Sequence, residues 1–278
     1  MTPMRVAVMG AGAVGGYFGA RLAEAGADVT FMARGEHLRA MQRHGLRITS
    51  VRGDLAIHGR FAAGPDGPGP ADLVLLAVKS QDTDARARAV TPLVARPTPI
   101  LSLQNGVDNA ECVARLWGAD RSVAGVAYIT TRVAAPGVIE HSGGGQIILG
   151  ATQPGGLATA RAAHAILAEA RIPCELSAHI GEALWKKLAW NAPFCALACL
   201  LRMTVGEILA SPGLDGPVRA WIEEVREAAA GRGVALPAST AQDLITVSAA
   251  LRDVKPSMLH DLEAGKPLEH EALNGVVV

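Results

Sequence analysis

The stretch MRVAVMGAGAVGG, residues 4–16, decides the fold of this chain. Its apolar half is short enough to form a buried strand, and it leads into glycines with the spacing G-x-G-x-x-G at Gly10, Gly12 and Gly15. An alanine-rich helical pattern follows over residues 14–25. A strand, a glycine turn and a helix in this order are typical of a site that binds a dinucleotide.

Each glycine of this turn has its own physical reason. Gly10 allows the tight turn out of the strand, Gly12 lets the backbone approach a pyrophosphate, and Gly15 lets the helix pack closely on the strand. The free N–H groups and the positive dipole end of the helix then face the phosphates. We therefore expect the cofactor to be bound by Gly10, Ala11, Gly12, Ala13, Val14 and Gly15.

The composition is that of a globular chain without a dominant charge. Its 278 residues are enough for two domains, and 26 basic residues balance 26 acidic ones, which argues against a nucleic-acid partner. No apolar window reaches the roughly 18 residues of a membrane span, and the N-terminus shows no export signal. The four cysteines form no CxxC pair, so we expect a cytoplasmic protein without disulfides or a metal site.

Two basic residues predict the type of dinucleotide. Arg34 follows the strand predicted at residues 28–32, where an NAD site usually has an acidic residue for the ribose 2′-hydroxyl. An arginine there suits a 2′-phosphate and indicates NADP, and the alternative is a solvated arginine at a helix entry. Lys79 follows the strand predicted at residues 71–78, where it either meets a cofactor phosphate or is an ordinary strand-end lysine.

Strands and helices alternate up to about residue 178. Beyond the strands already named, we predict strands at residues 99–103 and 123–133, and a hairpin in which residues 138–141 and 146–151 pair across residues 142–145. This pattern predicts a doubly wound α/β domain over residues 1–178. Long helical patterns follow, so residues 179–278 are expected to form an all-helical domain that supplies the substrate groups.

Three polar residues in or next to these elements are candidate site residues: Asn105, Lys187 and Asn191. Asn105 lies at the carboxyl end of the strand at residues 99–103, where its amide can bond a nicotinamide or a substrate, or serve only as a turn residue. Lys187 and Asn191 share one face of the helix predicted at residues 181–201, among apolar neighbours. If Lys187 is partly desolvated, its pKa is lowered and it can act as a general acid. The alternative is a surface lysine whose carbon stem covers apolar area, and this description suits Lys186 better than Lys187.

The last segment of the chain has ordinary local signals. Ser257 has the composition of a helix N-cap, and residues 265–267 read as a helix stop. Glu269 then falls in the first turn of the next helix, which by itself indicates no function.

Together, these segments resemble the ketopantoate reductases (2-dehydropantoate 2-reductases). The resemblance rests on the glycine turn, Lys79, residues 104–106, residues 185–191 and residues 257–269, which occur in the family's order. It covers nearly the whole chain, and its two C-terminal segments are more specific than the glycine turn. It implies a Rossmann-type domain followed by a helical domain, as in 6-phosphogluconate-dehydrogenase-like proteins. The implied activity is the NADPH-dependent reduction of 2-dehydropantoate, a small 2-oxo acid, to (R)-pantoate in pantothenate biosynthesis.

The resemblance also implies roles for individual residues. Lys187 is then the general acid that protonates the C2 oxygen, and Glu269 binds a hydroxyl of the substrate or of the cofactor ribose. By the same resemblance, Asn191 and Ser257 bind polar groups of the substrate, and Asn105 lies near the nicotinamide. Arg34 and Lys79 then lie at the 2′-phosphate end, and Thr131 aligns with a position whose backbone contacts the cofactor.

The sequence departs from the family's pattern on the substrate side. Cys195 and Val254 stand where relatives usually have asparagines, which leaves open another 2-oxo acid as the substrate. Relatives also usually continue beyond residues 274–278 into a further helix, so either the sequence is cut there or its tail is short. A catalytically idle NADP(H) sensor is a further alternative, and the sequence leaves open a homodimer.

Overall fold

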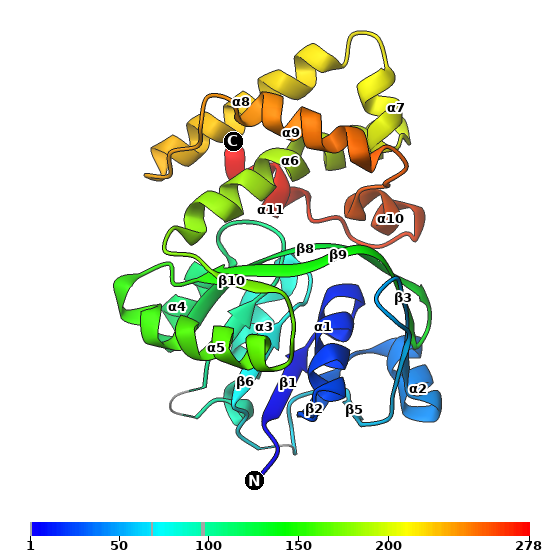
Figure 1. Cartoon of the computed structure of the whole chain (residues 1–278), viewed down its shortest axis with the longest axis vertical. Coiled ribbons are helices and arrows are strands. Elements are labelled where there is room, and N and C mark those ends of the chain that lie inside the picture. Colours follow the sequence, from blue (N-terminus) through cyan, green and yellow to red (C-terminus); the bar gives the residue numbers. More distant parts are fainter. Residues whose placement is uncertain (1, 68, 96–97) are drawn as a thin grey trace. The chain divides into compact units, whose positions relative to one another are not determined.

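The computed structural model of the chain describes residues 2–67, 69–95 and 98–278, and it divides into two compact units (Figure 1). The first unit comprises the described residues up to Gln104 together with Asp108–Ile180. The second comprises Gly181–Val278 and the short segment Asn105–Val107, which is separated from the rest of this unit in the sequence.

A single mixed sheet forms the centre of the first unit. Its strands are β1 (Arg5–Met9), β2 (Asp28–Met32), β3 (Leu46–Ser50), β4 (Leu55–Ile57), β5 (Arg60–Ala62), β6 (Leu73–Leu76), β7 (Ile100–Ser102), β8 (Ser122–Ala135), β9 (Val138–Gly150) and β10 (Cys174–Leu176). They lie in the order β4-β3-β9-β8-β7-β6-β1-β2-β5, and β10 also pairs with β9. The run from β5 to β8 is parallel, and β9 is antiparallel to β8. The predicted doubly wound α/β domain is therefore confirmed.

Helices cover both faces of this sheet, which explains why its central strands are apolar throughout. The helices are α1 (Ala13–Glu24), α2 (Gly35–His44), α3 (Thr83–Ala89), α4 (Asn109–Trp117) and α5 (Leu157–Glu169), with short 3₁₀ turns η1 (Ser80–Asp82), η2 (Thr91–Leu93) and η3 (Pro154–Gly156). Val8 of β1 is buried in one core with Phe18 of α1, whereas Met9 is buried in another with Ala87 of α3. Neighbouring residues on a strand point to opposite faces, so both must be apolar.

The hairpin predicted between residues 138 and 151 is wrong. Residues 138–150 form one continuous strand, β9, which pairs with β8 over its length. Gly144 and Gly145 have φ angles of 71° and 97°, and the register with β8 shifts beside them. The glycines therefore produce an irregularity within a strand, as glycine does at β-bulges, and not a chain reversal.

The second unit is built from helices α6 (Ile180–Leu201, apart from its first residue), α7 (Val205–Ala210), α8 (Asp215–Gly231), α9 (Thr240–Ser248), α10 (Ser257–Glu263) and α11 (His270–Leu273), with 3₁₀ turns η4 (Ala249–Leu251) and η5 (Gly275–Val277). Leu188 and Phe194 of α6 are buried in one core with Ile222 of α8 and Leu259 of α10. Val107 belongs to the same core, which explains why the segment around it joins this unit. The predicted helical domain is confirmed.

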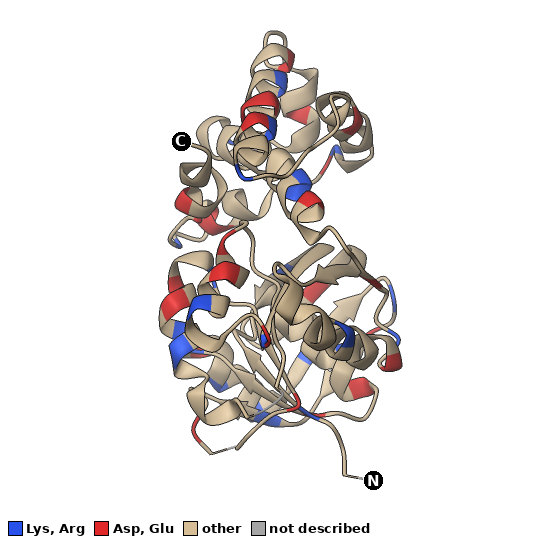
Figure 2. Ribbon diagram, turned by 90° about the vertical axis from the view of Figure 1, so that its left-hand side faces the viewer, with Lys and Arg blue, Asp and Glu red and all other residues tan. Residues whose placement is uncertain are grey.

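Charged residues of both signs are interspersed along the elements of each unit (Figure 2). Among the described residues, no helix combines the length and apolar character needed to cross a bilayer.

Candidate active site

The glycine turn joins β1 to α1 within the first unit, and two of its glycines are required by the fold. Gly10 has a φ of 98°, and a Cβ placed on it would lie 2.7 Å from the Val78 nitrogen. A Cβ on Gly15 would lie 2.3 Å from the Gly10 carbonyl oxygen. Both distances are below contact for a real Cβ, so a side chain at either position would push backbone segments apart.

Gly12 has a different environment. A Cβ on it would meet nothing within 4 Å, so the protein itself does not require a glycine there. Gly12 is the N-cap of α1 without a side-chain cap, and the Gly16 N–H donates to its carbonyl at 2.8 Å. The N–H groups before Gly16 have no intrahelical acceptor, as at every helix start. The turn thus offers both open space and backbone donors, which fit a pyrophosphate.

Arg34 and Lys79 follow the two strands that flank β1. Arg34 follows β2 as the N-cap of α2, and Lys79 precedes η1 after β6. The Arg34 side chain is exposed, and its Nη2 lies 2.9 Å from Oδ2 of Asp82, the last residue of η1. β2 and β6 pair with opposite edges of β1. The Arg34–Asp82 ion pair therefore joins the segments that follow these two strands, at the end of β1 where the glycine turn begins. The pattern of the sequence did not point to Asp82.

Thr131 lies on β8, and its hydroxyl has a structural partner. Its Oγ1 donates to the Glu140 carbonyl oxygen of β9 at 2.8 Å. The hydroxyl therefore joins two strands of the sheet, and the contact expected with a cofactor was one of the Thr131 backbone.

Lys187 lies on α6 in the second unit, on the helix where the sequence predicted it. Burial lowers the pKa of its ammonium group to about 8, against the opposing effect of the negative charge of Glu269, which raises it. The residue as a whole is half-buried. Lys187 therefore has an ammonium group surrounded by protein and a proton that it can release near neutral pH.

Asn191 and Cys195 follow Lys187 at successive turns of α6. Asn191 is 6% exposed, yet no hydrogen bond joins its amide to another described residue. The Asn191 amide therefore has donors and an acceptor available for a ligand. Burial raises the pKa of the Cys195 thiol to about 12, and the Met258 N–H donates to its sulfur. Cys195 is thus a neutral thiol that contacts the start of α10.

Glu269 is brought to α6 by the end of the chain. It is 4% exposed and is the N-cap of α11, one position before the first helical turn in which the sequence placed it. Asn274, at the other end of α11, donates from Nδ2 to the Ala192 carbonyl oxygen of α6 at 3.0 Å. This hydrogen bond fixes α11 to α6 next to the Lys187 and Asn191 turns. No local pattern in the sequence pointed to Asn274.

Ser257 and Asn105 complete the set of predicted residues in the second unit. Ser257 is the first residue of α10 and Pro256 is its N-cap, so the predicted N-cap role of Ser257 is wrong. The Ser257 side chain is exposed, and the extended backbone of Pro256 provides the entry to the helix. Asn105 begins the segment that Val107 anchors in the core of the second unit, so the structure places it in the same unit as Lys187.

A family model described as "Ketopantoate reductase PanE/ApbA" matches residues 6–154, and one described as "Ketopantoate reductase PanE/ApbA C terminal" matches residues 179–278. The chain belongs to the ketopantoate reductase family. As a member, it is an oxidoreductase that uses a nicotinamide dinucleotide.

Similar proteins support the family and the fold. A 2-dehydropantoate 2-reductase of Mesorhizobium japonicum is 30% identical over 99% of this chain and 90% of its own length. A crystal structure of 2-dehydropantoate 2-reductase from Geobacter metallireducens is 36% identical, covers 99% of this chain and 92% of its own, and has a TM-score of 0.93. A structure of D-mandelate dehydrogenase with NADH and anilino(oxo)acetate is 21% identical, covers 99% and 90%, and has a TM-score of 0.91, so it shares the fold.

Proposed function

We propose that this chain reduces 2-dehydropantoate to (R)-pantoate with NADPH, a step of pantothenate biosynthesis. The observation that carries the proposal is the cluster of Lys187, Asn191 and Glu269 in the second unit. The chain that contains this cluster matches the family models over residues 6–154 and 179–278. In this cluster the buried ammonium group of Lys187 is influenced by the charge of Glu269, one turn from the unbonded amide of Asn191.

The residues of the first unit fit the cofactor. Gly12 leaves room for a pyrophosphate at the start of α1, and Arg34 and Lys79 supply positive charge beside it for a 2′-phosphate. When bound, NADPH supplies a hydride to the C2 carbonyl carbon of the substrate.

Lys187 supplies the proton. As the carbonyl π electrons move to the C2 oxygen, the ammonium group stabilises the negative charge there and then transfers a proton to it. One hydride and one proton convert the ketone into a secondary alcohol, and Lys187 is left neutral until it takes a proton from water. Its lowered pKa makes this transfer easier than from an ordinary lysine.

Other residues of the second unit bind and orient the substrate in this proposal. Asn191 and Ser257 bind its polar groups, Glu269 accepts a hydrogen bond from a hydroxyl, and Asn105 holds the carbonyl end near the nicotinamide. The test is to incubate the protein with NADPH and 2-dehydropantoate and to analyse the product by chiral chromatography. The (R)-alcohol in amounts equal to the NADPH consumed is the expected result, and no alcohol or the (S)-alcohol would refute it.

A second candidate is the reduction of a less polar 2-oxo acid. Cys195 supports it, because a buried neutral thiol is a weak hydrogen-bond donor and a poor substitute for an amide. Val254 likewise offers no polar side chain. Under this alternative, removing the substrate's hydroxyl does not lower kcat/KM.

The pH dependence follows from the pKa of Lys187. The general acid must be protonated, so kcat/KM for reduction is expected to be constant below about pH 8 and to fall tenfold per pH unit above it. The charge of Glu269 raises this pKa, so Glu269→Gln should move the falling limb to lower pH. The measurement is a pH profile of kcat/KM for both proteins. An unmoved limb in the variant would show that Lys187 is not the titrating group.

The Arg34–Asp82 ion pair predicts an effect on cofactor choice. The Asp82 carboxylate and a 2′-phosphate compete for the same guanidinium, so Asp82→Asn is expected to lower the Kd for NADPH by about two- to fivefold. The Kd for NADH should stay within about twofold, because NADH carries no 2′-phosphate. Arg34→Ala is the matched control and should raise the Kd for NADPH by about tenfold or more. Fluorescence titration measures the Kd of both cofactors for the two variants and the unaltered protein, and equal changes for the two cofactors would contradict the prediction.

A further inference from the structure

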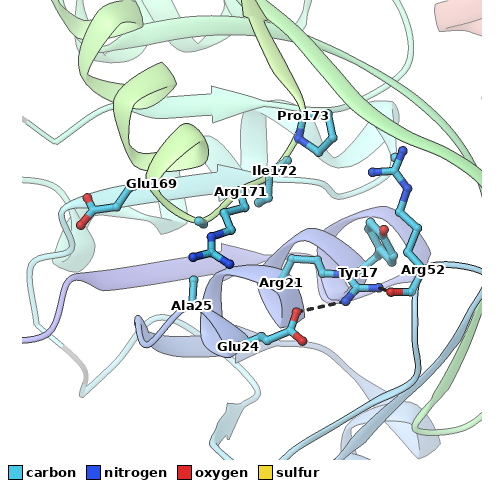
Figure 3. Close-up of a pocket in the computed structure, with 11 residues that line it drawn as sticks. Tyr17, Arg21, Glu24, Ala25, Arg52, Glu169, Arg171, Ile172 and Pro173 are labelled. Atoms are coloured by element: carbon cyan, nitrogen blue, oxygen red, sulfur yellow. Dashed lines mark hydrogen bonds and ion pairs between the residues drawn. The ribbon is translucent and has the colours of Figure 1, made fainter.

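The first unit has a cavity that the glycine turn does not line (Figure 3). Its volume is about 650 Å³. It is lined by Tyr17, Arg21, Glu24, Ala25, Arg52, Gly145, Glu169, Ala170, Arg171, Ile172 and Pro173. None of these residues belongs to the turn, to the positions proposed for the 2′-phosphate, or to the second unit. The cavity has the size of a small-molecule site and no role in the proposed reaction.

One of the three lining arginines is structural. The Arg21 guanidinium pairs with Glu24 at 3.0 Å and donates to the Ser50 hydroxyl at 3.2 Å and the Gly53 carbonyl at 3.1 Å. These bonds tie α1 to the turn between β3 and β4. Arg21 therefore forms a fixed, internally paired part of the wall.

The other two arginines are available to a ligand. Figure 3 shows Arg52 on one side of Tyr17 and Arg171 on the other, and Glu169 beyond Arg171, on the side away from Arg52. Both arginines are exposed, and neither guanidinium forms an ion pair or hydrogen bond with another described residue. Each offers a planar set of donors that matches a carboxylate or a phosphate.

The backbone at Arg171 gives independent support. After α5 the Ile172 N–H donates to the Leu167 carbonyl at 3.0 Å and the Arg171 N–H to the Ala168 carbonyl at 2.9 Å. This is a Schellman ending, in which the left-handed position is usually glycine. Here that position is Arg171, with a φ of 55°. A side chain in a conformation that favours glycine is a strain typical of functional sites.

A buried polar atom, Nε2 of His141, lies close to the wall of the cavity. His141 is 2% exposed, its Nδ1 lies 2.8 Å from the Ser50 hydroxyl oxygen, and its Nε2 has no hydrogen-bond partner among the described residues. A Cβ on Gly145 would lie 3.5 Å from Nε2. The His141 ring also lies against that of Tyr17, with ring centroids 4.3 Å apart, and both Gly145 and Tyr17 line the cavity.

We propose that this cavity is a second anion site, which binds a small organic molecule with at least two negatively charged groups. One group binds the Arg52 guanidinium and the other binds that of Arg171. The groups are phosphates or carboxylates, because both match the guanidinium geometry. The inference rests on the first unit alone and holds whether or not the proposed reduction is correct.

The test is isothermal titration calorimetry of the whole protein with two probes, inorganic pyrophosphate and citrate, in the presence of saturating NADPH. NADPH keeps the probes from the glycine turn. We expect one of the two probes to bind with one site per chain, and the probe that binds identifies the ligand as phosphorylated or as a polycarboxylate. Arg52→Ala and Arg171→Ala are each expected to weaken binding by about tenfold or more.

Two further variants separate binding from folding. Arg171→Gly removes the guanidinium but suits the left-handed backbone, so it should lose binding while its thermal midpoint is unchanged or higher. Arg161→Ala removes an exposed arginine of α5 that does not line the cavity, so it should bind as the unaltered protein does. No binding of either probe, or equal binding by the Arg52 and Arg171 variants and the unaltered protein, would overturn the proposal.

Discussion

Replacing Lys187 by methionine is expected to lower kcat for 2-oxo acid reduction by about 10²–10⁴-fold, the range for loss of a general acid. Methionine keeps most of the volume and the unbranched stem, so the core around α6 should stay packed. The Kd for NADPH should be unchanged, because Lys187 and the glycine turn lie in different units. Steady-state kinetics with a separate cofactor titration measures both quantities.

Lys186→Met is the matched control for this prediction. Lys186 is the preceding residue of the same helix, but its side chain is exposed. The control variant is expected to retain kcat within about twofold, as for most exposed substitutions away from a site. If both variants kept their activity, Lys187 would not be the proton donor.

The second large effect is expected at Gly15. An added Cβ at this position would lie 2.3 Å from the Gly10 oxygen and 2.9 Å from the Ala77 Cβ, so Gly15→Ala must push α1 away from β1. We expect a loss of about 3 kcal/mol in the free energy of unfolding, at the upper end for overpacking, and a loss of cofactor binding. Urea unfolding and NADPH titration measure these effects.

Gly12→Ala separates the two uses of glycine in the same turn. Its Cβ would meet no protein atom within 4 Å and its φ is −78°, so stability should change by less than about 0.5 kcal/mol. The Kd for NADPH should nevertheless rise by about tenfold, because the methyl group fills space meant for the pyrophosphate. If Gly12→Ala bound NADPH normally, the cofactor would not approach the turn as proposed.

Much of the fold could be predicted because its signals are local. The glycine spacing depends on contacts within one turn, and Gly10 and Gly15 are required there for the steric reasons expected. The strand at Leu73–Leu76 is buried on both faces, and its uninterrupted apolar run indicated this directly.

The errors in the fold arise where pairing depends on distant segments. The glycines at residues 143–145 resemble a hairpin turn locally, but β8 pairs along the whole of β9 and makes one strand of it. Asn105–Val107 resembles a turn after β7, and only the packing of Val107 with the helical core shows that it belongs to the second unit. Both features are determined by contacts between residues that are far apart in the sequence.

In the candidate site, too, local features could be predicted from the sequence and contacts between distant segments could not. Lys187 and Asn191 could be paired from the sequence, because residues one turn apart on a helix share a face. The charge of Glu269 near Lys187 depends on the return of the chain end to α6, which the Asn274 hydrogen bond fixes. Residue types alone did not predict that contact; the family resemblance supplied Glu269 as a site residue.

The most direct test of the proposed function compares two substrates that differ by one hydroxyl group. These are 2-dehydropantoate and 3,3-dimethyl-2-oxobutanoate, in which a methyl group replaces the hydroxymethyl group. The measurement is kcat/KM for each with saturating NADPH. A site that binds this hydroxyl should prefer 2-dehydropantoate by about tenfold or more. Equal values, or a preference for the methyl compound, would contradict the assignment and favour the less polar substrate suggested by Cys195 and Val254.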